Sequence, residues 1–312
     1  MKKIAIVGSG LIGRAWATIF ASSGFKVALY DVAPGAAKAA RAHIGKNLKE
    51  LAGHGLVKNP KAALARIRVA DDLADALGDV ALVQENGPET ITAKIALFAE
   101  MDRLAPKKAI LASSTSFIIA SRFSENLPGR ARCLVAHPVN PPHLVPIVEL
   151  APAPWTDPKV VKRARKIYEK AGQVPILLRK ELPGFVLNRL QAVLLAEAFR
   201  IVGAGVASPQ DVDKTIRDGL GLRWSFMGPF ETIELNAPGG IPDYCARYGP
   251  SLHEMVREAP SGNPFGPETV EAVMADWGGA KSAEEVAALS NWRDARLAAL
   301  KAHKRAAKKK PR

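Results

Sequence analysis

The sequence has little of several features that would mark particular classes of protein. Only two of its 312 residues are cysteines, Cys133 and Cys245, and their wide separation fits neither a disulfide framework nor a metal-binding pattern. No apolar stretch is long enough to cross a bilayer, and no signal-peptide cleavage site follows the basic start of the chain. Aromatic residues make up 6%, and no nucleic-acid motif occurs. We therefore expect a cytoplasmic protein that binds neither membrane nor nucleic acid and holds no metal.

Acidic residues are also fewer than basic ones. The chain has 44 Lys and Arg against 30 Asp and Glu, which leaves a net charge of +14. Part of this excess lies in residues 301–312, KAHKRAAKKKPR, which contain no acid and no apolar stripe. This basic tail is expected to be a disordered, solvated end, and nonspecific attraction to polyanions is the alternative.

The first part of the sequence alternates short apolar runs with helical patterns. Strands are expected at residues 3–7, 26–30, 80–84, 109–112, 133–136, 146–150 and 173–178. Such alternation is typical of an α/β fold with a parallel, doubly wound sheet. After residue 182 the strands stop, and helices are expected at 185–202, 209–218, 229–247 and 282–303. The sequence therefore predicts a Rossmann-type domain over residues 1–182 and a smaller all-α domain over residues 183–300.

A glycine-rich turn follows the first expected strand. Residues 8–13 read Gly-Ser-Gly-Leu-Ile-Gly and open a helical pattern, and Asp31 ends the next strand. This context favours a dinucleotide site in which the pyrophosphate binds the helix N-terminus and the carboxylate binds the adenosine ribose. A carboxylate there repels a 2′-phosphate, so NAD is favoured over NADP, and a purely structural turn is the alternative. The cofactor-binding residues predicted here are Gly8, Gly10, Leu11, Ile12, Gly13 and Asp31.

Two ionisable residues lie in an otherwise apolar segment, AHPVNPPHLVPIVEL, at residues 136–150. His137 ends one apolar run, and the prolines at 141 and 142 can return the chain so that Glu149 lies beside it. A carboxylate bonded to one imidazole nitrogen fixes the tautomer and leaves the other nitrogen as a general base. The alternative is that His137 is a core histidine with no chemical role.

Further polar residues are expected near the same edge of the sheet. Residues 113–116, Ser-Ser-Thr-Ser, follow a strand, and a helix cap is the alternative role for any one of these hydroxyls. Asn188 falls in the first turns of the first helix of the second domain, from which it could reach back across the interdomain cleft.

Taken together, the motifs resemble those of the 3-hydroxyacyl-CoA dehydrogenase superfamily, and in particular its branch with lambda-crystallin and L-gulonate 3-dehydrogenase. The likeness covers nearly the whole chain and is weakest over residues 35–80 and the basic tail. The segments that carry it are GSGLIG (8–13), LYD (29–31), VQENGPE (83–89), ASSTS (112–116), AHPVNPPHLVPIVEL (136–150), PGFVLNRLQ (183–191) and GLGLRWSFMGPFET (219–232).

The resemblance implies roles for particular residues. It implies that His137 is the general acid/base, that Glu149 orients it, and that Ser116 and Asn188 hold the reacting oxygen. It also implies that Glu85 and Lys94 help to shape the cofactor site, although a surface salt bridge is the alternative. A homodimer is expected, mainly from the family likeness and from the long apolar-faced helices of the second domain.

The substrate remains open between two classes. Arg223 resembles an arginine of the gulonate-type branch, and its guanidinium could bind the carboxylate of a free hydroxy acid, unless it forms a structural ion pair. Four lysines would favour a coenzyme A ester as the substrate instead, if they bind the phosphates of coenzyme A: Lys46, Lys49, Lys58 and Lys61. We expect NAD-dependent oxidation of the 3-hydroxyl of an L-3-hydroxy acid such as L-gulonate. The alternatives are an L-3-hydroxyacyl-CoA (3-hydroxybutyryl-CoA) dehydrogenase, a carnitine-type dehydrogenase, and a non-catalytic crystallin-like or dinucleotide-binding protein.

Overall fold

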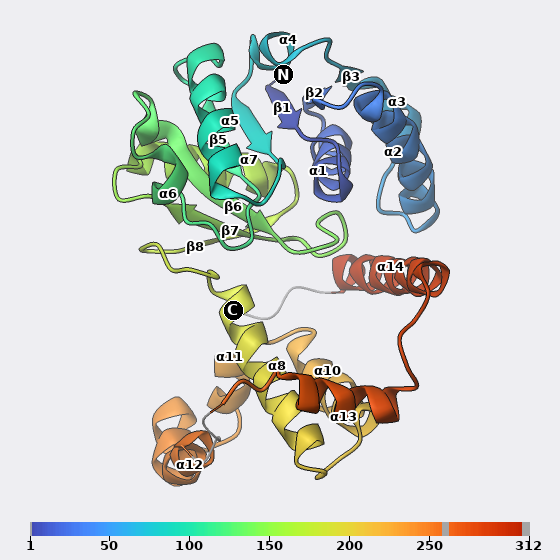
Figure 1. Ribbon diagram of the computed structural model, residues 1–312, viewed down its shortest axis with the longest axis vertical. Helices are drawn as coiled ribbons and strands as arrows, with labels where there is room; N and C mark the ends of the chain where they lie inside the picture. The colour runs from blue at the N-terminus through green and yellow to red at the C-terminus, as the bar shows by residue number, and fades with distance from the viewer. Residues whose placement is uncertain (1, 258–261, 308–312) are drawn as a thin grey trace. The chain divides into compact units, whose positions relative to one another are not determined.

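The computed structural model describes residues 2–257 and 262–307 (Figure 1). The chain divides into two compact units. The first comprises residues 1–188 and 286–312, and the second comprises residues 189–285. The domain boundaries expected from the sequence, 1–182 and 183–300, stay a prediction.

An eight-stranded sheet forms the centre of the first unit. Its order is β3-β2-β1-β4-β5-β6-β7-β8, and every neighbouring pair is parallel except β6 and β7. The Rossmann-type doubly wound sheet is thus confirmed, with two strands of reversed direction at one edge. The strands are β1 (Lys3–Val7), β2 (Lys26–Tyr30), β3 (Ile67–Val69), β4 (Leu82–Glu85), β5 (Ile110–Ser113), β6 (Cys133–Pro138), β7 (Ile147–Pro152) and β8 (Val174–Leu177).

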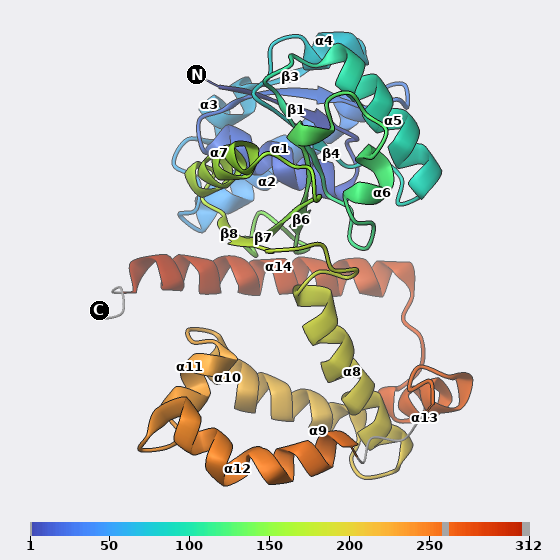
Figure 2. The same ribbon diagram turned by 90° about the vertical axis from the view of Figure 1, so that its left-hand side faces the viewer.

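Helices cover both faces of this sheet (Figure 2). On one face, α1, α2 and α7 enclose a core in which the rings of Trp16 and Tyr168 lie 5.4 Å apart. On the other face, α4, α5 and α6 enclose a second core, where the Phe98 and Phe123 rings lie 4.3 Å apart. The helices are α1 (Leu11–Ser22), α2 (Ala36–Gly53), α3 (Pro60–Ala65), α4 (Leu73–Leu77), α5 (Ile91–Leu104), α6 (Ser121–Ser124), the 3-10 turn η1 (Arg130–Arg132) and α7 (Pro158–Lys170).

The described residues of the second unit form helices joined by turns and contain no strand, as expected. The helix expected at 209–218 is present and changes to π-helical geometry partway along, whereas the helix expected at 229–247 is divided, so only the second of these predictions is wrong. A π-helical segment, η2, replaces regular helix from Thr215, and Gly240, with φ of 69°, starts a new helix after a break that follows Glu234. The elements are α8 (Leu187–Gly203), α9 (Pro209–Lys214), η2 (Thr215–Leu220), α10 (Gly221–Trp224), α11 (Pro229–Glu234), α12 (Gly240–Arg257) and α13 (Pro267–Trp277).

The last helix, α14 (Ala283–Ala306), begins with the expected capping box. The Ser282 amide donates to Glu285 Oε2 at 2.7 Å, and the Glu285 amide donates to Ser282 Oγ at 3.2 Å. These reciprocal bonds satisfy two amides that the first helical turn leaves without intrahelical acceptors.

The end of α14 packs on the sheet domain of the first unit. Ala298 is buried in that core, Lys301 Nζ donates to the carbonyl of His143 at 2.8 Å, and Arg305 donates to the carbonyl of Leu56 at 3.1 Å. Burial lowers the pKa of Lys301 to about 8. Residues 301–306, expected to belong to a disordered tail, are therefore helical because these contacts hold them. Residues 308–312 lie outside the described residues.

Three features are absent from the described residues: a helix that could span a membrane, a cluster that could hold a metal ion, and a disulfide. No helix within residues 2–257 and 262–307 is long and apolar enough to span a bilayer. The same residues contain no group of three or more His, Cys, Asp or Glu suited to holding a metal ion. Cys133 and Cys245 are both free thiols, and burial raises the pKa of Cys133 to about 12, which makes it a core residue rather than a nucleophile.

Candidate active site

The glycine turn between β1 and α1 has the geometry expected of a dinucleotide site. Gly8 has φ of 90°, which disfavours any residue with a side chain. A Cβ on Gly13 would lie 1.9 Å from the carbonyl oxygen of Gly8, so only glycine lets α1 pack this closely on the strand. Around Gly10, in contrast, no atom lies within 4 Å of an added Cβ. The backbone at Gly10 is therefore open to the close approach of a ligand.

The N-terminus of α1 offers unpaired amides at this turn. Gly10 is the cap residue and supplies no side-chain acceptor, and Leu11 and Ile12 form the first turn of the helix. Such amides and the positive end of the helix dipole suit a phosphate group.

Asp31 lies directly after β2, where the sequence predicted it. Its Oδ2 accepts from the amide of Ser9 at 2.6 Å and the hydroxyl of Ser9 at 2.7 Å, and its Oδ1 accepts from the amide of Ala33 at 3.0 Å. Burial by itself would raise the pKa of the Asp31 carboxyl, but these hydrogen bonds outweigh it and hold the pKa below its usual value. The carboxylate is thus fixed in its charged form beside the glycine turn.

His137 and Glu149 are direct partners across the antiparallel β6–β7 pair. His137 Nδ1 and Glu149 Oε2 lie 2.7 Å apart, and the side chains are only 5% and 0% exposed. The Phe185 ring covers the imidazole, with ring centres 5.2 Å apart. The bend at the prolines therefore does return the chain as the sequence indicated, and the pair shares one buried hydrogen bond.

A second set of contacts fixes the other oxygen of Glu149. Oε1 accepts from the amides of Val186 and Leu187 at 2.9 and 3.0 Å, at the start of α8. Asn188, one residue further, donates from Nδ2 to the carbonyl oxygen of Ser116 at 2.9 Å. The first turn of α8 thus links the backbone of the Ser116 loop to the carboxylate that holds His137.

Glu89 also holds the Ser116 loop, and sequence reasoning missed it. Its Oε1 accepts from the Thr115 hydroxyl at 2.5 Å, the Ser116 amide at 2.9 Å and the Phe117 amide at 3.2 Å, while Oε2 lies 3.5 Å from Lys94 Nζ. Burial alone would raise the pKa of Glu89, but these donors and the Lys94 charge lower it. Its position just after β4, in the segment VQENGPE, was the signal available in the sequence.

Glu85 and Lys94 form a fully buried ion pair rather than a surface salt bridge. Lys94 Nζ lies 3.1 Å from both carboxylate oxygens, and the side chains are 1% and 0% exposed. Glu85 also accepts from the amide of Gly87 at 2.6 Å and the hydroxyl of Ser113 at 2.5 Å. The pair therefore joins the carboxyl ends of β4 and β5 to α5 and supports the loop that Glu89 holds.

The expected substrate-binding cations are not part of this network. Arg223 is an exposed residue of α10 in the second unit, and its guanidinium has no ion-pair partner in the part of the chain that the structure describes. Four lysines of the α2–α3 region are likewise exposed: Lys46, Lys49, Lys58 and Lys61.

Two family models match the chain. The NAD-binding domain of 3-hydroxyacyl-CoA dehydrogenase matches residues 3–182, and the C-terminal domain of 3-hydroxyacyl-CoA dehydrogenase matches residues 184–288. Together these matches cover most of the chain, including both the glycine turn and the first turn of α8.

Known relatives agree with this assignment. Lambda-crystallin of Oryctolagus cuniculus is 41% identical over 96% of both chains, and the L-carnitine dehydrogenase of Pseudomonas aeruginosa is 36% identical over 94% of this chain and 91% of its own. A solved FHMPC 5-dehydrogenase, an NAD⁺-dependent dismutase, is 28% identical with a TM-score of 0.81 and covers 96% of this chain and 97% of its own. The chain belongs to the 3-hydroxyacyl-CoA dehydrogenase family and is an NAD-dependent oxidoreductase.

Proposed function

We propose that the protein oxidises the 3-hydroxyl of a free L-3-hydroxy acid, L-gulonate or a similar sugar acid, with NAD. The observation that carries the chemistry is the buried His137–Glu149 hydrogen bond of 2.7 Å, placed beside the loop that holds Ser116. A positioned acid/base of this kind suits proton removal from an alcohol. A structural or crystallin-like role does not require a buried acid/base pair, so the pair disfavours the non-catalytic alternatives.

The residues of the glycine turn fit NAD. The open backbone at Gly10 and the amides at the start of α1, from Leu11 and Ile12, would hold the pyrophosphate. Asp31, kept charged by its hydrogen bonds, would accept from the ribose hydroxyls. When bound, NAD supplies the hydride acceptor of the reaction. We assign Glu85 and Lys94 a supporting role, since their contacts hold the strand ends and the Ser116 loop.

The protein side of the reaction is proton transfer at His137. Because Nδ1 is hydrogen-bonded to Glu149, Nε2 is the nitrogen left to take the hydroxyl proton. Glu149 is held by the amides of Val186 and Leu187, so it cannot rotate away, and it stabilises the imidazolium that forms. We assign the Ser116 hydroxyl and the Asn188 amide to hold the substrate oxygen. In the reverse direction, His137 returns the proton to the ketone.

Arg223 supports the proposal that the substrate carries a free carboxylate. Its exposed guanidinium is available for a bidentate bond to a carboxylate. Relatives named for L-carnitine and for a pyridine carboxylic acid act on molecules that carry a free carboxylate. The second candidate, an L-3-hydroxyacyl-CoA such as 3-hydroxybutyryl-CoA, is favoured by the family name and by the exposed lysines of the α2–α3 region.

Substrate choice is tested by measuring NADH formation with L-gulonate, L-carnitine, L-3-hydroxybutyrate and L-3-hydroxybutyryl-CoA. We expect the free acid to be preferred, and Arg223→Ala to lower kcat/KM for it by about 10- to 100-fold, as for loss of a charged hydrogen bond. Arg217→Ala is the matched control, because Arg217 is an exposed arginine of the same unit and forms an ion pair with Asp218. If the CoA ester is preferred and Arg223→Ala leaves kcat/KM unchanged, the free-acid proposal is wrong and the acyl-CoA activity takes its place.

We also propose that the protein is a homodimer. Many apolar side chains of the second unit are exposed, among them Val193 at 72%, Phe230 at 73% and Val256 at 76%. Exposed apolar surface of this extent is typical of a surface that a partner covers. Light scattering is expected to give about twice the 33.3 kDa mass of one chain. A mass equal to one chain at assay concentrations would contradict the dimer.

A further inference from the structure

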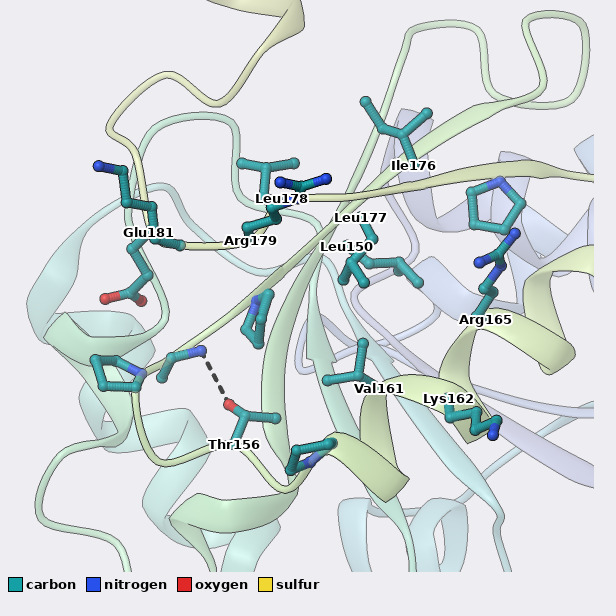
Figure 3. A pocket seen from close by; sticks show the side chains of 16 residues that line it. Leu150, Thr156, Val161, Lys162, Arg165, Ile176, Leu177, Leu178, Arg179 and Glu181 are labelled. Atoms are coloured by element: carbon teal, nitrogen blue, oxygen red, sulfur yellow. Dashed lines mark hydrogen bonds between the residues drawn. The ribbon is translucent and has the colours of Figure 1, made fainter.

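A pocket of about 510 Å³ lies between β8 and α7 in the first unit (Figure 3). Sixteen residues line it, from the β7–α7 region and from β8 with the four residues that follow it. None of the proposed catalytic residues is among them. The volume falls within the range of small-molecule sites, although the proposed reaction does not use this pocket.

The lining combines an apolar floor with basic side chains. Leu150, Val161 and Leu177 lie in the middle of the view, with basic side chains on both sides (Figure 3). The prolines at 152, 154, 158 and 175 extend the apolar surface. The basic residues of the lining are Lys162, Arg165, Arg179 and Lys180, and its single acidic residue is Glu181.

Within the described residues, three of these four cations form no ion pair. Arg165 is paired with Glu169 at 2.8 Å, and Glu181 accepts from the amide of Ser121 at 2.8 Å. Across residues 2–257 and 262–307, no side-chain ion pair is formed by the remaining three, which are Lys162, Arg179 and Lys180. The pocket therefore carries unbalanced positive charge around an apolar floor.

We propose that this pocket binds a small amphiphilic carboxylate, an unbranched aliphatic acid for which decanoate serves as the probe. The alkyl chain would lie on Leu150, Val161 and Leu177, where its burial removes apolar surface from water. The carboxylate would bind Arg179, whose planar guanidinium can donate two parallel hydrogen bonds. This site is distinct from the one proposed for the oxidation and does not depend on its substrate.

The segment that follows β8 connects this pocket to the catalytic residues. Leu178 and Glu181 line the pocket, whereas Val186 and Leu187, later in the same segment, donate their amides to Glu149. Phe185, between them, has φ of 52°, a left-handed conformation that is unusual for a residue with a side chain. A ligand in the pocket would contact the segment whose other end orients Glu149.

The test is calorimetric titration of decanoate into the full-length protein saturated with NADH. We expect one site per chain, and Arg179→Gln should weaken decanoate binding by about tenfold or more, because a charge-assisted bidentate contact is lost. Arg163→Gln is the matched control, since Arg163 is on α7, bonds the carbonyl of Lys108 and does not line the pocket. It should bind decanoate as the wild type does.

A second variant tests the apolar floor. Leu177 is 50% exposed on the edge strand, so Leu177→Glu should leave the fold and NADH binding intact while placing a negative charge under the ligand. Loss of decanoate binding in this variant supports the site. The proposal is overturned if decanol binds as tightly as decanoate, if Arg179→Gln binds decanoate normally, or if a saturating hydroxy-acid substrate displaces decanoate. The last result would place the ligand in the catalytic site instead.

Discussion

Replacing His137 with Ala is expected to lower turnover by roughly 100- to 10,000-fold, the contribution of a positioned acid/base group. Alanine cannot take the hydroxyl proton, and Glu149 cannot replace the imidazole, because its side chain is buried and its Oε1 stays bound to the amides of Val186 and Leu187. NADH affinity should stay within about twofold, since no contact of the glycine turn involves His137. Steady-state kcat and a fluorescence titration with NADH measure the two effects.

His137→Gln separates proton transfer from folding. Removing the imidazole leaves Glu149 Oε2 buried without a partner, which costs about 1–3 kcal/mol of unfolding free energy. Glutamine can still donate a hydrogen bond to that oxygen, so the variant should unfold closer to the wild type yet remain as inactive as His137→Ala. Near-normal turnover in His137→Gln would show that His137 is a structural residue and that another group moves the proton.

The sheet domain was predictable because its signals are local. Short apolar runs, the glycine turn and the Ser282–Glu285 capping box each depend on residues close in the chain, and the structure has all of them. The three-residue strand Ile67–Val69 was missed because it is too short to show a pattern and forms by pairing with β2. The helical state of residues 301–306 was missed for a similar reason, since the contact of Lys301 is with a loop 158 residues away in sequence.

In the candidate site, the pairing of His137 with Glu149 was predictable from the sequence, but the residues that support this pair were not. The proximity of His137 and Glu149 followed from two apolar runs and a proline bend, which together specify an antiparallel pair. Glu89 could not be distinguished from a surface acid, because its role depends on three donors 26 to 28 residues further along the chain. The burial of Glu85 and Lys94 was equally unpredictable from the sequence. Two opposite charges at short spacing usually lie on the protein surface, so the sequence favours a surface pair.

Gly13→Ala is expected to weaken NADH binding by about 100-fold and to lower the free energy of unfolding by about 1–3 kcal/mol, as overpacking does. The added Cβ would lie 1.9 Å from the Gly8 carbonyl oxygen and 3.4 Å from Ile6 Cγ2, so α1 must move away from β1. That movement displaces the amides of Leu11 and Ile12 that are assigned to the pyrophosphate. NADH fluorescence titration and denaturant unfolding measure the two losses.

Gly10→Ala is the matched comparison, because the same added methyl group contacts no other protein atom at that position. Gly10 has φ of −64° and no atom within 4 Å of an added Cβ, so the free protein should unfold as the wild type does. NADH binding should nevertheless fall by about tenfold or more, since the methyl group would occupy the space through which the pyrophosphate approaches the backbone. If Gly10→Ala loses NADH binding but not stability, Gly10 serves the approach of the ligand. If Gly13→Ala loses both, Gly13 serves the packing of the helix. Unchanged NADH affinity in Gly10→Ala would mean that the pyrophosphate does not approach this turn, and would contradict the placement of NAD at the N-terminus of α1.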